Sequence, residues 1–472
     1  MTDTERTVPM TAFEKRFKHP PGLVILFFAE MWERFSYYGM RGLLKLYMAN
    51  YLFVTLREQL QGCKQATPPC DLVTGNPSTV TFWPTIQHWL PSAPAEAASM
   101  MYGTYTALVY LTPFFGGIIA DRYLGQRKTV VVGGALMALG HFVMAIENSF
   151  FVALFLLILG NGAFKPNIST QVGGLYPPGD PRRDGAFTIF YMGINLGAFI
   201  CNFVCGTLAA VYGWHYGFAA AGVGMCLGLV VYMWGQKYLA TDNLSKAKAE
   251  HHEKREPFTQ SEWTRVWALV VLCALNIVFW AVYEQQGNTM QSWADEQTIW
   301  PTVLGFQIPS TWFQSFNPLC IILLAPMLDM FWQRQAKKGT EPSSVSKMAI
   351  GCIILGLSFI VMIAGAKIVG AGKGSMFWPL FCTFLLTIGE LYLSPIGLSL
   401  VTKVSPARIV SMMMGMWFIS SFLGNFLSGY IGVFYTRWSK EGFFAFLTAL
   451  GLAAGFAMWA FNKPLKKAVG PH

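Results

Sequence analysis

The 472-residue sequence is 54% hydrophobic and only 12% charged, and its formal net charge is +10. A soluble protein coats its surface with about a quarter charged residues, so this composition excludes a soluble multidomain enzyme. The high apolar content also excludes a disordered chain. The basic residues lie mainly in alternate loops between apolar stretches, which favours contact with anionic lipid headgroups over binding of nucleic acid. We expect an integral membrane protein.

Twelve apolar stretches are long enough to cross a bilayer as helices, which takes about 20 residues each. They lie near 22–50, 97–121, 128–147, 150–172, 186–211 and 215–239, and then near 265–292, 304–332, 347–369, 376–402, 409–433 and 441–462. The sequence therefore predicts an all-α membrane protein with two six-helix bundles, at 22–239 and 265–462. A linker at 240–264 joins the bundles, tails occupy 1–21 and 463–472, and 51–96 form an external loop.

The charges of the loops predict the orientation. The loops on the side of the two tails are rich in Lys and Arg, as in Arg122, Arg127 and Lys128, whereas the opposite loops hold few basic residues. Positive loops are retained in the cytoplasm, so both termini and the linker are expected to be cytoplasmic.

Cysteine and histidine spacing gives no metal site. Seven of the nine cysteines lie in apolar spans and are expected to be small core residues. Cys63 and Cys70 share the external loop, where a disulfide could persist, but their spacing permits the bond without requiring it. Apart from the adjacent loop pair His251 and His252, the histidines show no metal-ligand spacing. The nucleophile motif GxSxG and the zinc motif HExxH are absent from the sequence. We therefore expect neither a metal, nor a cofactor, nor an enzyme.

Ionisable residues inside a span are costly unless they are paired or wetted, so they mark functional positions. In the first span, helical spacing places seven polar residues on one face: Glu30, Glu33, Arg34, Tyr37, Tyr38, Arg41 and Lys45. The alternative is a structural ladder of ion pairs that pins the helix. Pinning needs only Ser, Thr or Gly, so the functional interpretation is favoured.

Further polar residues lie within other spans. Lys165 precedes Pro166 in the fourth span, too far from either end for its ammonium to reach the headgroups. The others are Asn195 in the first half and Glu284, Asn317 and Glu390 in the second. Trp280 and Trp417 lie deeper than an interfacial belt and are expected to be pocket walls. Cations from one half (Arg34, Lys165) would face an anion from the other (Glu390), an arrangement suited to a zwitterion such as a short peptide.

Several of these segments resemble motifs of the proton-dependent oligopeptide transporters, a branch of the major facilitator superfamily. The run E-M-W-E-R-F-S-Y-Y-G at 30–39 is similar to the motif E-x-x-E-R-F-x-Y-Y-G, and F-Y-M-G-I-N-L-G at 190–197 is similar to F-Y-x-x-I-N-x-G. Further similarities lie at 165–167, 280–285, 314–318 and 389–398, and 121–128 resembles the general loop motif of the superfamily.

The resemblance implies the superfamily fold and a symporter that imports di- and tripeptides with protons by alternating access. It implies a multi-pass protein of the plasma membrane, in bacteria the inner membrane, that works as a monomer. Arg34 and Lys165 would bind the peptide carboxylate and Glu390 the ammonium, while Asn195 and Asn317 would bind the backbone or termini. Tyr38, Tyr110, Trp280, Ser394 and Trp417 would line the pocket. Glu30, Glu33, Arg34, Lys165 and Glu284 would couple the proton, and Arg41 would pair with Glu284 in an external gate.

Two departures from the family pattern affect these expectations. The second span carries Gly103 where animal members have a proton-linked histidine, so coupling here would depend on carboxylates. The linker is too short for the two extra helices of many bacterial members. Among alternatives, transport of nitrate or another small anion would need no anionic Glu390, and a channel would be blocked by paired charges at mid-span.

Overall fold

The computed structural model describes residues 17–58, 86–177, 180, 182–240, 259–406 and 409–469. Cys63 and Cys70, with most of the expected linker and external loop, lie outside these residues, so their possible disulfide stays a prediction.

Long helices dominate the described part of the chain. Twelve of them have 18 or more residues: α2 (Pro21–Tyr47), α5 (Pro94–Ile119), α6 (Gln126–Val143), α7 (Phe150–Gly174), α8 (Arg182–Tyr212), α9 (Trp214–Gly235), α11 (Gln260–Tyr283), α13 (Phe316–Lys337), α14 (Ser344–Val369), α15 (Phe377–Val404), α16 (Val410–Arg437) and α17 (Lys440–Val469). Ten satisfy a length and hydropathy criterion for membrane spans. The two that do not are α2, which carries the seven polar residues predicted to share one face, and α6, which begins with Gln126, Arg127 and Lys128. The all-helical membrane fold is confirmed.

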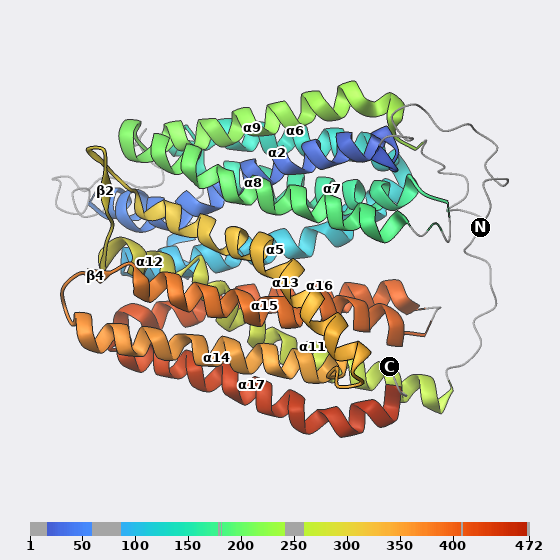
Figure 1. Cartoon of the computed structure of the whole chain (residues 1–472). Coiled ribbons are helices and arrows are strands. Elements are labelled where there is room, and N and C mark those ends of the chain that lie inside the picture. Colours follow the sequence, from blue (N-terminus) through green and yellow to red (C-terminus); the bar gives the residue numbers. More distant parts are fainter. Residues whose placement is uncertain are drawn as a thin grey trace.

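The helices form two bundles, one above the other in Figure 1. One cluster of buried apolar side chains lies within 23–239 and a second within 266–458. In the first, α2 packs on α8 and α9 and α6 packs on α7; in the second, α14 packs on α15 and α17. The bundles meet mainly where α5 packs against α16.

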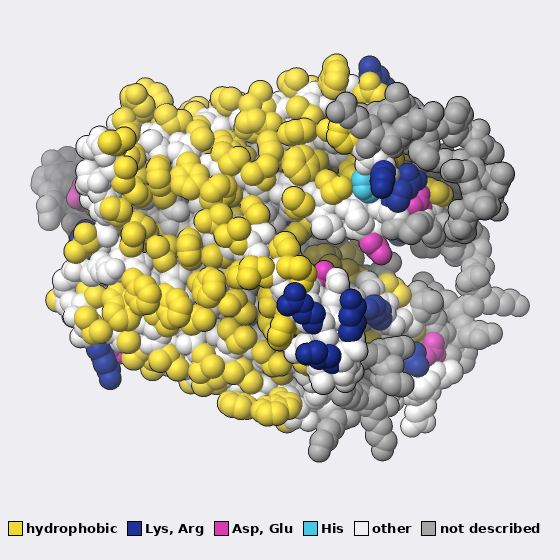
Figure 2. Space-filling model, viewed as in Figure 1, with side chains coloured by type: hydrophobic (Ala, Val, Ile, Leu, Met, Phe, Trp, Pro, Cys, Tyr) yellow, Lys and Arg dark blue, Asp and Glu magenta, His cyan; other side chains and the backbone are white. Residues whose placement is uncertain are grey.

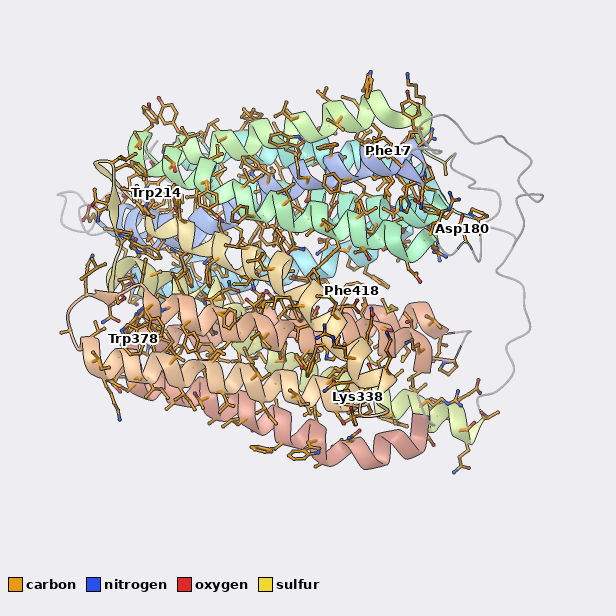
Figure 3. All side chains as sticks on the ribbon, in the orientation of Figure 1. Phe17, Asp180, Trp214, Lys338, Trp378 and Phe418 are labelled. Atoms are coloured by element: carbon orange, nitrogen blue, oxygen red, sulfur yellow. The ribbon has the colours of Figure 1, made fainter. Side chains whose placement is uncertain are left out.

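The two ends of the molecule differ. At one end, β2 (Thr302–Val303) and β3 (Phe306–Gln307) form an antiparallel hairpin, and β1 (Thr298–Ile299) pairs in parallel with β4 (Gly374–Ser375). We call this the hairpin end. The other end, where α2 begins and α17 finishes, is the terminus end (Figure 1). Side chains project from every helix in Figure 3; Trp214 and Trp378 mark the hairpin end, and Asp180 and Lys338 mark the terminus end.

Apolar side chains cover the flank of both bundles, as expected for a surface in contact with lipid (Figure 2). Lys and Arg side chains gather at the terminus end of this face, where the surface is hollowed between the bundles.

Three predicted boundaries are wrong. The seventh span is not one helix over 265–292: α11 stops at Tyr283, a 3-10 turn covers Glu284–Gln286, and a short helix, α12 (Thr289–Glu296), follows. The eighth helix starts at Phe316 and not at 304, because the hairpin and a 3-10 turn (Ser310–Ser315) precede it. The helix after α2 continues through residue 58, beyond the predicted start of the loop at 51.

Candidate substrate cavity

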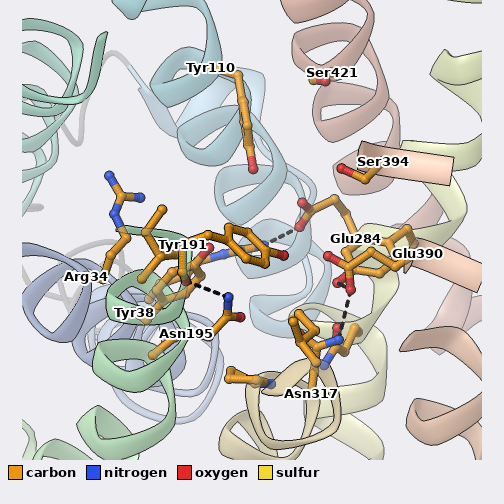
Figure 4. Close-up of a pocket in the computed structure, with 18 of the residues that line it drawn as sticks. Arg34, Tyr38, Tyr110, Tyr191, Asn195, Glu284, Asn317, Glu390, Ser394 and Ser421 are labelled. Carbon is orange, nitrogen blue, oxygen red and sulfur yellow. Dashed lines mark hydrogen bonds and ion pairs between the residues drawn. The ribbon is translucent and has the colours of Figure 1, made fainter. Parts of the chain in front are cut away.

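A cavity of about 300 Å³ lies between the bundles, at the lower end of the range for ligand pockets. Both bundles contribute charged, aromatic and amide side chains to its wall (Figure 4). All ten residues predicted to bind substrate line it: Arg34, Tyr38, Tyr110, Lys165, Asn195, Trp280, Asn317, Glu390, Ser394 and Trp417. Glu30, Arg41 and Glu284 line it too, whereas Glu33 does not.

The cationic side of the cavity belongs to α2 and α7. Arg34 is 2% exposed, and its Nε lies 2.9 Å from Glu30 Oε1 and 2.6 Å from Glu33 Oε2. Its Nη2 has no hydrogen-bond partner among the described residues. Lys165 Nζ lies 4.7 Å from the centroid of the Tyr110 ring, a cation–π contact. The arginine therefore keeps a free donor that an anion could bind.

The anionic side is Glu390 on α15. Its Oε2 accepts hydrogen bonds from the Tyr283 hydroxyl at 2.7 Å and from Asn317 Nδ2 at 3.0 Å. Asn317 Nδ2 also donates to Thr387 Oγ1 at 2.9 Å, which fixes the amide in the first turn of α13. Within the described ranges no hydrogen bond reaches Glu390 Oε1. The carboxylate is thus held by one oxygen, while the other can accept a bond from a cation.

Two tryptophans form apolar walls because glycines make room for them. A methyl group on Gly397 would lie 2.1 Å from Trp417 Cη2, and one on Gly424 would lie 2.4 Å from Trp280 Cβ. On the opposite wall, Asn195 Nδ2 donates to the Tyr191 carbonyl at 3.0 Å. These walls are broad and mostly apolar, which suits cargo with varied side chains.

Of the seven polar residues predicted to share one face of α2, some line the cavity and others lie inside the bundle. Glu33 is fully buried and accepts a hydrogen bond from Asn161 Nδ2 on α7 at 3.3 Å. Lys45, only 1% exposed, donates to Ser99 Oγ at 2.7 Å and to the Ala95 carbonyl at 2.8 Å on α5. Glu33 and Lys45 therefore face neighbouring helices.

Polar contacts close the cavity at the hairpin end. Arg41 forms an ion pair with Glu284, and Arg41 Nε donates to the Tyr102 hydroxyl at 2.8 Å. Farther out, Arg437 Nη2 on α16 lies 2.6 Å from Glu96 Oε2 on α5. The hollow seen in Figure 2 lies at the opposite, terminus end. Ion pairs and hydrogen bonds thus join the bundles at the hairpin end, whereas the surface between them is hollowed at the terminus end.

Gly103 lies at a point where the backbones of α5 and α16 are in close contact. A methyl group on it would be 2.4 Å from the Gly429 Cα and 2.9 Å from the Asn425 carbonyl oxygen. Both neighbours are backbone atoms that cannot rotate away. A histidine at this position would not fit in the present conformation, which gives a steric reason for the glycine.

Comparison with known proteins identifies the family. A family model described as the POT family matches residues 127–255 and 252–446. The chain is 33% identical to the peptide transporter YePEPT of Yersinia enterocolitica, covering 88% of each protein. It is 32% identical to a di-/tripeptide transporter of Lactococcus lactis, covering 96% of this chain and 97% of that one. The chain belongs to the POT family.

Solved structures agree with membership of the POT family. A crystal structure of a mutant peptide transporter POT in complex with alafosfalin is 32% identical with a TM-score of 0.81, and 98% of each chain is covered. A POT family transporter in complex with 5-aminolevulinic acid is 27% identical with a TM-score of 0.77, over 95% of this chain and 97% of that one. This POT-family chain is therefore a multi-pass transporter of the plasma membrane and not an enzyme.

Several residues in or beside the cavity of this POT-family chain were not predicted from the sequence to have a role. Tyr191 and Tyr283 stand inside segments that resemble family motifs, but no role was expected of them. The only sequence signal of Ser421 on α16 and Asn161 on α7 is that each is a polar residue within an apolar span. That signal would have identified both as candidate functional residues. Among the described residues, no group of three His, Cys, Asp or Glu side chains could hold a metal ion.

Proposed function

We propose that the chain is a proton-coupled symporter that imports di- and tripeptides by alternating access. The observation that supports this most is the charge arrangement of the cavity, where Arg34 and Lys165 come from one bundle and Glu390 from the other. A zwitterion with separated termini matches this arrangement, and it bridges the two bundles when it binds.

The carboxylate of the peptide would bind Arg34 and Lys165. Arg34 Nη2 is buried and unpartnered within the described residues, and a guanidinium binds a carboxylate through paired N–H donors. The ammonium would bind Glu390 Oε1, the oxygen left free by Tyr283 and Asn317. The amides of Asn195 and Asn317 would bind the peptide backbone.

Alternating access would require the hairpin end to open while the terminus end closes. The ion pair between Arg41 and Glu284 joins the bundles, so opening must separate these two side chains. If the terminus end is cytoplasmic, as the loop charges predict, the present conformation faces inward and is ready to release or exchange cargo.

Proton coupling would arise at the carboxylates beside Arg34. Glu30 and Glu33 compete with a peptide carboxylate for the same guanidinium. Protonation of one of them weakens its hold on Arg34 and frees the arginine for cargo, and loss of the proton reverses this. By linkage, proton and peptide then strengthen each other's binding.

Transport of nitrate or another small anion is the alternative within the family. Glu390 disfavours it, because a carboxylate held in the wall of the cavity by two donors would repel an anion, whereas it attracts an ammonium group.

Uptake by purified protein in proteoliposomes tests the proposal. Labelled di-alanine should accumulate at an external pH lower than the internal pH, and a protonophore should abolish the accumulation. Unlabelled di- and tri-alanine should compete, whereas alanine, tetra-alanine and nitrate should not. Competition by nitrate without competition by dipeptides would favour the anion carrier, and accumulation without a proton gradient would reject coupling.

A further inference from the structure

The two carboxylates that share Arg34 have different surroundings. Glu30 lines the cavity, its Oε1 pairs with Arg34, and its buried Oε2 has no hydrogen-bond partner among the described residues. Glu33 is absent from the cavity wall; its Oε2 pairs with Arg34 and its Oε1 accepts a hydrogen bond from Asn161 Nδ2 at 3.3 Å. In the described part of the chain, the hydrogen bond that Glu33 has and Glu30 lacks is the one from the amide of Asn161.

Asn161 is held in place by the helices around it. It is fully buried on α7, one turn before Lys165. A methyl group on Gly160 would lie 2.7 Å from the Gly133 carbonyl oxygen, and one on Gly162 would lie 2.6 Å from Thr112 Cβ. These close contacts press α7 against α5 and α6, so the backbone of Asn161 cannot withdraw from Glu33.

Two carboxylates beside one guanidinium in a dry environment favour the binding of one proton by the pair. An N–H donor stabilises a carboxylate over its protonated form, because only the charged oxygen attracts the donor strongly. Asn161 supplies such a donor to Glu33, whereas within the described chain Glu30 receives none besides Arg34. The proton should therefore reside on Glu30, whose side chain lines the cavity.

We infer that Asn161 is a positioning residue of the coupling site: its amide keeps Glu33 ionised beside Arg34 and directs the transported proton to Glu30. The inference rests on the proposed symport and assigns a role to a residue that does not touch cargo. The charged groups that act on Glu33 are Glu30 and Arg34 on α2 and Lys165 on α7. The phenol of Tyr105 on α5 also lies within electrostatic reach of Glu33.

The test is the pH dependence of peptide counterflow, measured with equal pH on both sides of the membrane. In Asn161→Leu, Glu33 loses its donor and also competes for the proton, so the pair binds protons more tightly. The midpoint of the pH profile should move up by about one pH unit, a tenfold change in proton affinity. Asn161→Ser, which keeps a hydroxyl donor, should show a smaller shift, with a midpoint closer to that of the wild type. It also provides a second variant if the leucine variant folds poorly.

A buried amide in the other bundle supplies a matched control. Asn276 is fully buried, donates to Ser420 Oγ at 2.8 Å and leaves its Oδ1 unpartnered within the described residues, but its partner is not a carboxylate. Asn276→Leu should leave the midpoint unchanged. In a Glu33→Gln background, Asn161→Leu should cause no further shift, because the carboxylate that it stabilises is gone.

Three results would overturn the inference: an unshifted midpoint in Asn161→Leu, the same shift in Asn276→Leu, or a full shift that persists with Glu33→Gln. Any of them leaves the proposed function intact as long as the wild-type protein transports di-alanine with protons. A wild-type protein that transports no peptide would instead reject the proposed function itself.

Discussion

Replacing Gly103 by alanine should destabilise the conformation that is closed at the hairpin end. The added methyl carbon would lie 2.4 Å from the Gly429 Cα, against a normal carbon–carbon contact of about 3.5–4.0 Å. The helices must separate by about 1 Å or more, and overpacking of this kind costs about 1–3 kcal/mol. That cost corresponds to a shift of about 5- to 150-fold toward conformations in which α5 and α16 lie apart.

Distances between spin labels on opposite bundles measure this shift. Labels at Trp89 and Leu304, both exposed at the hairpin end, should move apart, and labels at Tyr123 and Lys338 at the terminus end should approach each other. Ketone-bearing unnatural residues can carry the labels, which leaves the native cysteines in place. The fraction of molecules at the longer hairpin-end distance should rise at least fivefold when it is small in the wild type.

Gly117 on the same helix provides the control. A methyl group there meets nothing within 4 Å, so Gly117→Ala changes helix propensity without changing the contact between bundles. The distance distributions of this variant should match those of the wild type. Unchanged distributions in Gly103→Ala, or equal changes in both variants, would refute the claim that the α5–α16 contact holds the hairpin end closed.

Three further substitutions test the proposed roles of ionisable and polar residues. Lys165→Ala should abolish accumulation of di-alanine driven by an inward proton gradient, and full accumulation by this variant would reject its role in coupling. Glu390→Gln should lower the apparent affinity for unmodified dipeptides at least tenfold more than that for N-acylated dipeptides in competition assays, since only the unmodified ones carry an ammonium group. Equal losses of affinity would reject the assignment of Glu390 to the ammonium group. Tyr283→Phe should raise the KM for dipeptides several-fold because Glu390 loses a donor that orients it, whereas an unchanged KM would show that Asn317 alone suffices.

The sequence predicted most of the fold because long apolar stretches mark membrane helices, and ten of the twelve long helices in the described residues meet a hydropathy criterion. It failed where tertiary contacts break a helix. Gly287 lies in the break after α11, and a methyl group on it would be 2.0 Å from the hydroxyl of Tyr102, a residue of the other bundle. Nothing in the apolar run at 265–292 signals that contact. The start of α13 was likewise misplaced, because the hairpin that precedes it is only moderately polar.

The candidate site was largely predictable because charges inside apolar spans are rare and costly. Their neutral partners were harder to find. Tyr283 bonds to Glu390, 107 residues away, and Asn161 bonds to Glu33, 128 residues away. Such pairs depend on how helices pack, and spacing along one helix does not contain that information. For the same reason, helical spacing placed Glu33 and Lys45 on one polar face of α2, but it could not show that both contact neighbouring helices.

The break between α11 and α12 divides one span into two parts with separate duties. Trp280 on α11 touches the cavity, whereas α12 lies beyond Glu284 and makes hairpin-end contacts such as the 2.9 Å bond from Asn50 to Asp295. Because α12 contributes no lining residue to the cavity, substitutions in it should change how readily the hairpin end opens more than they change the cavity wall.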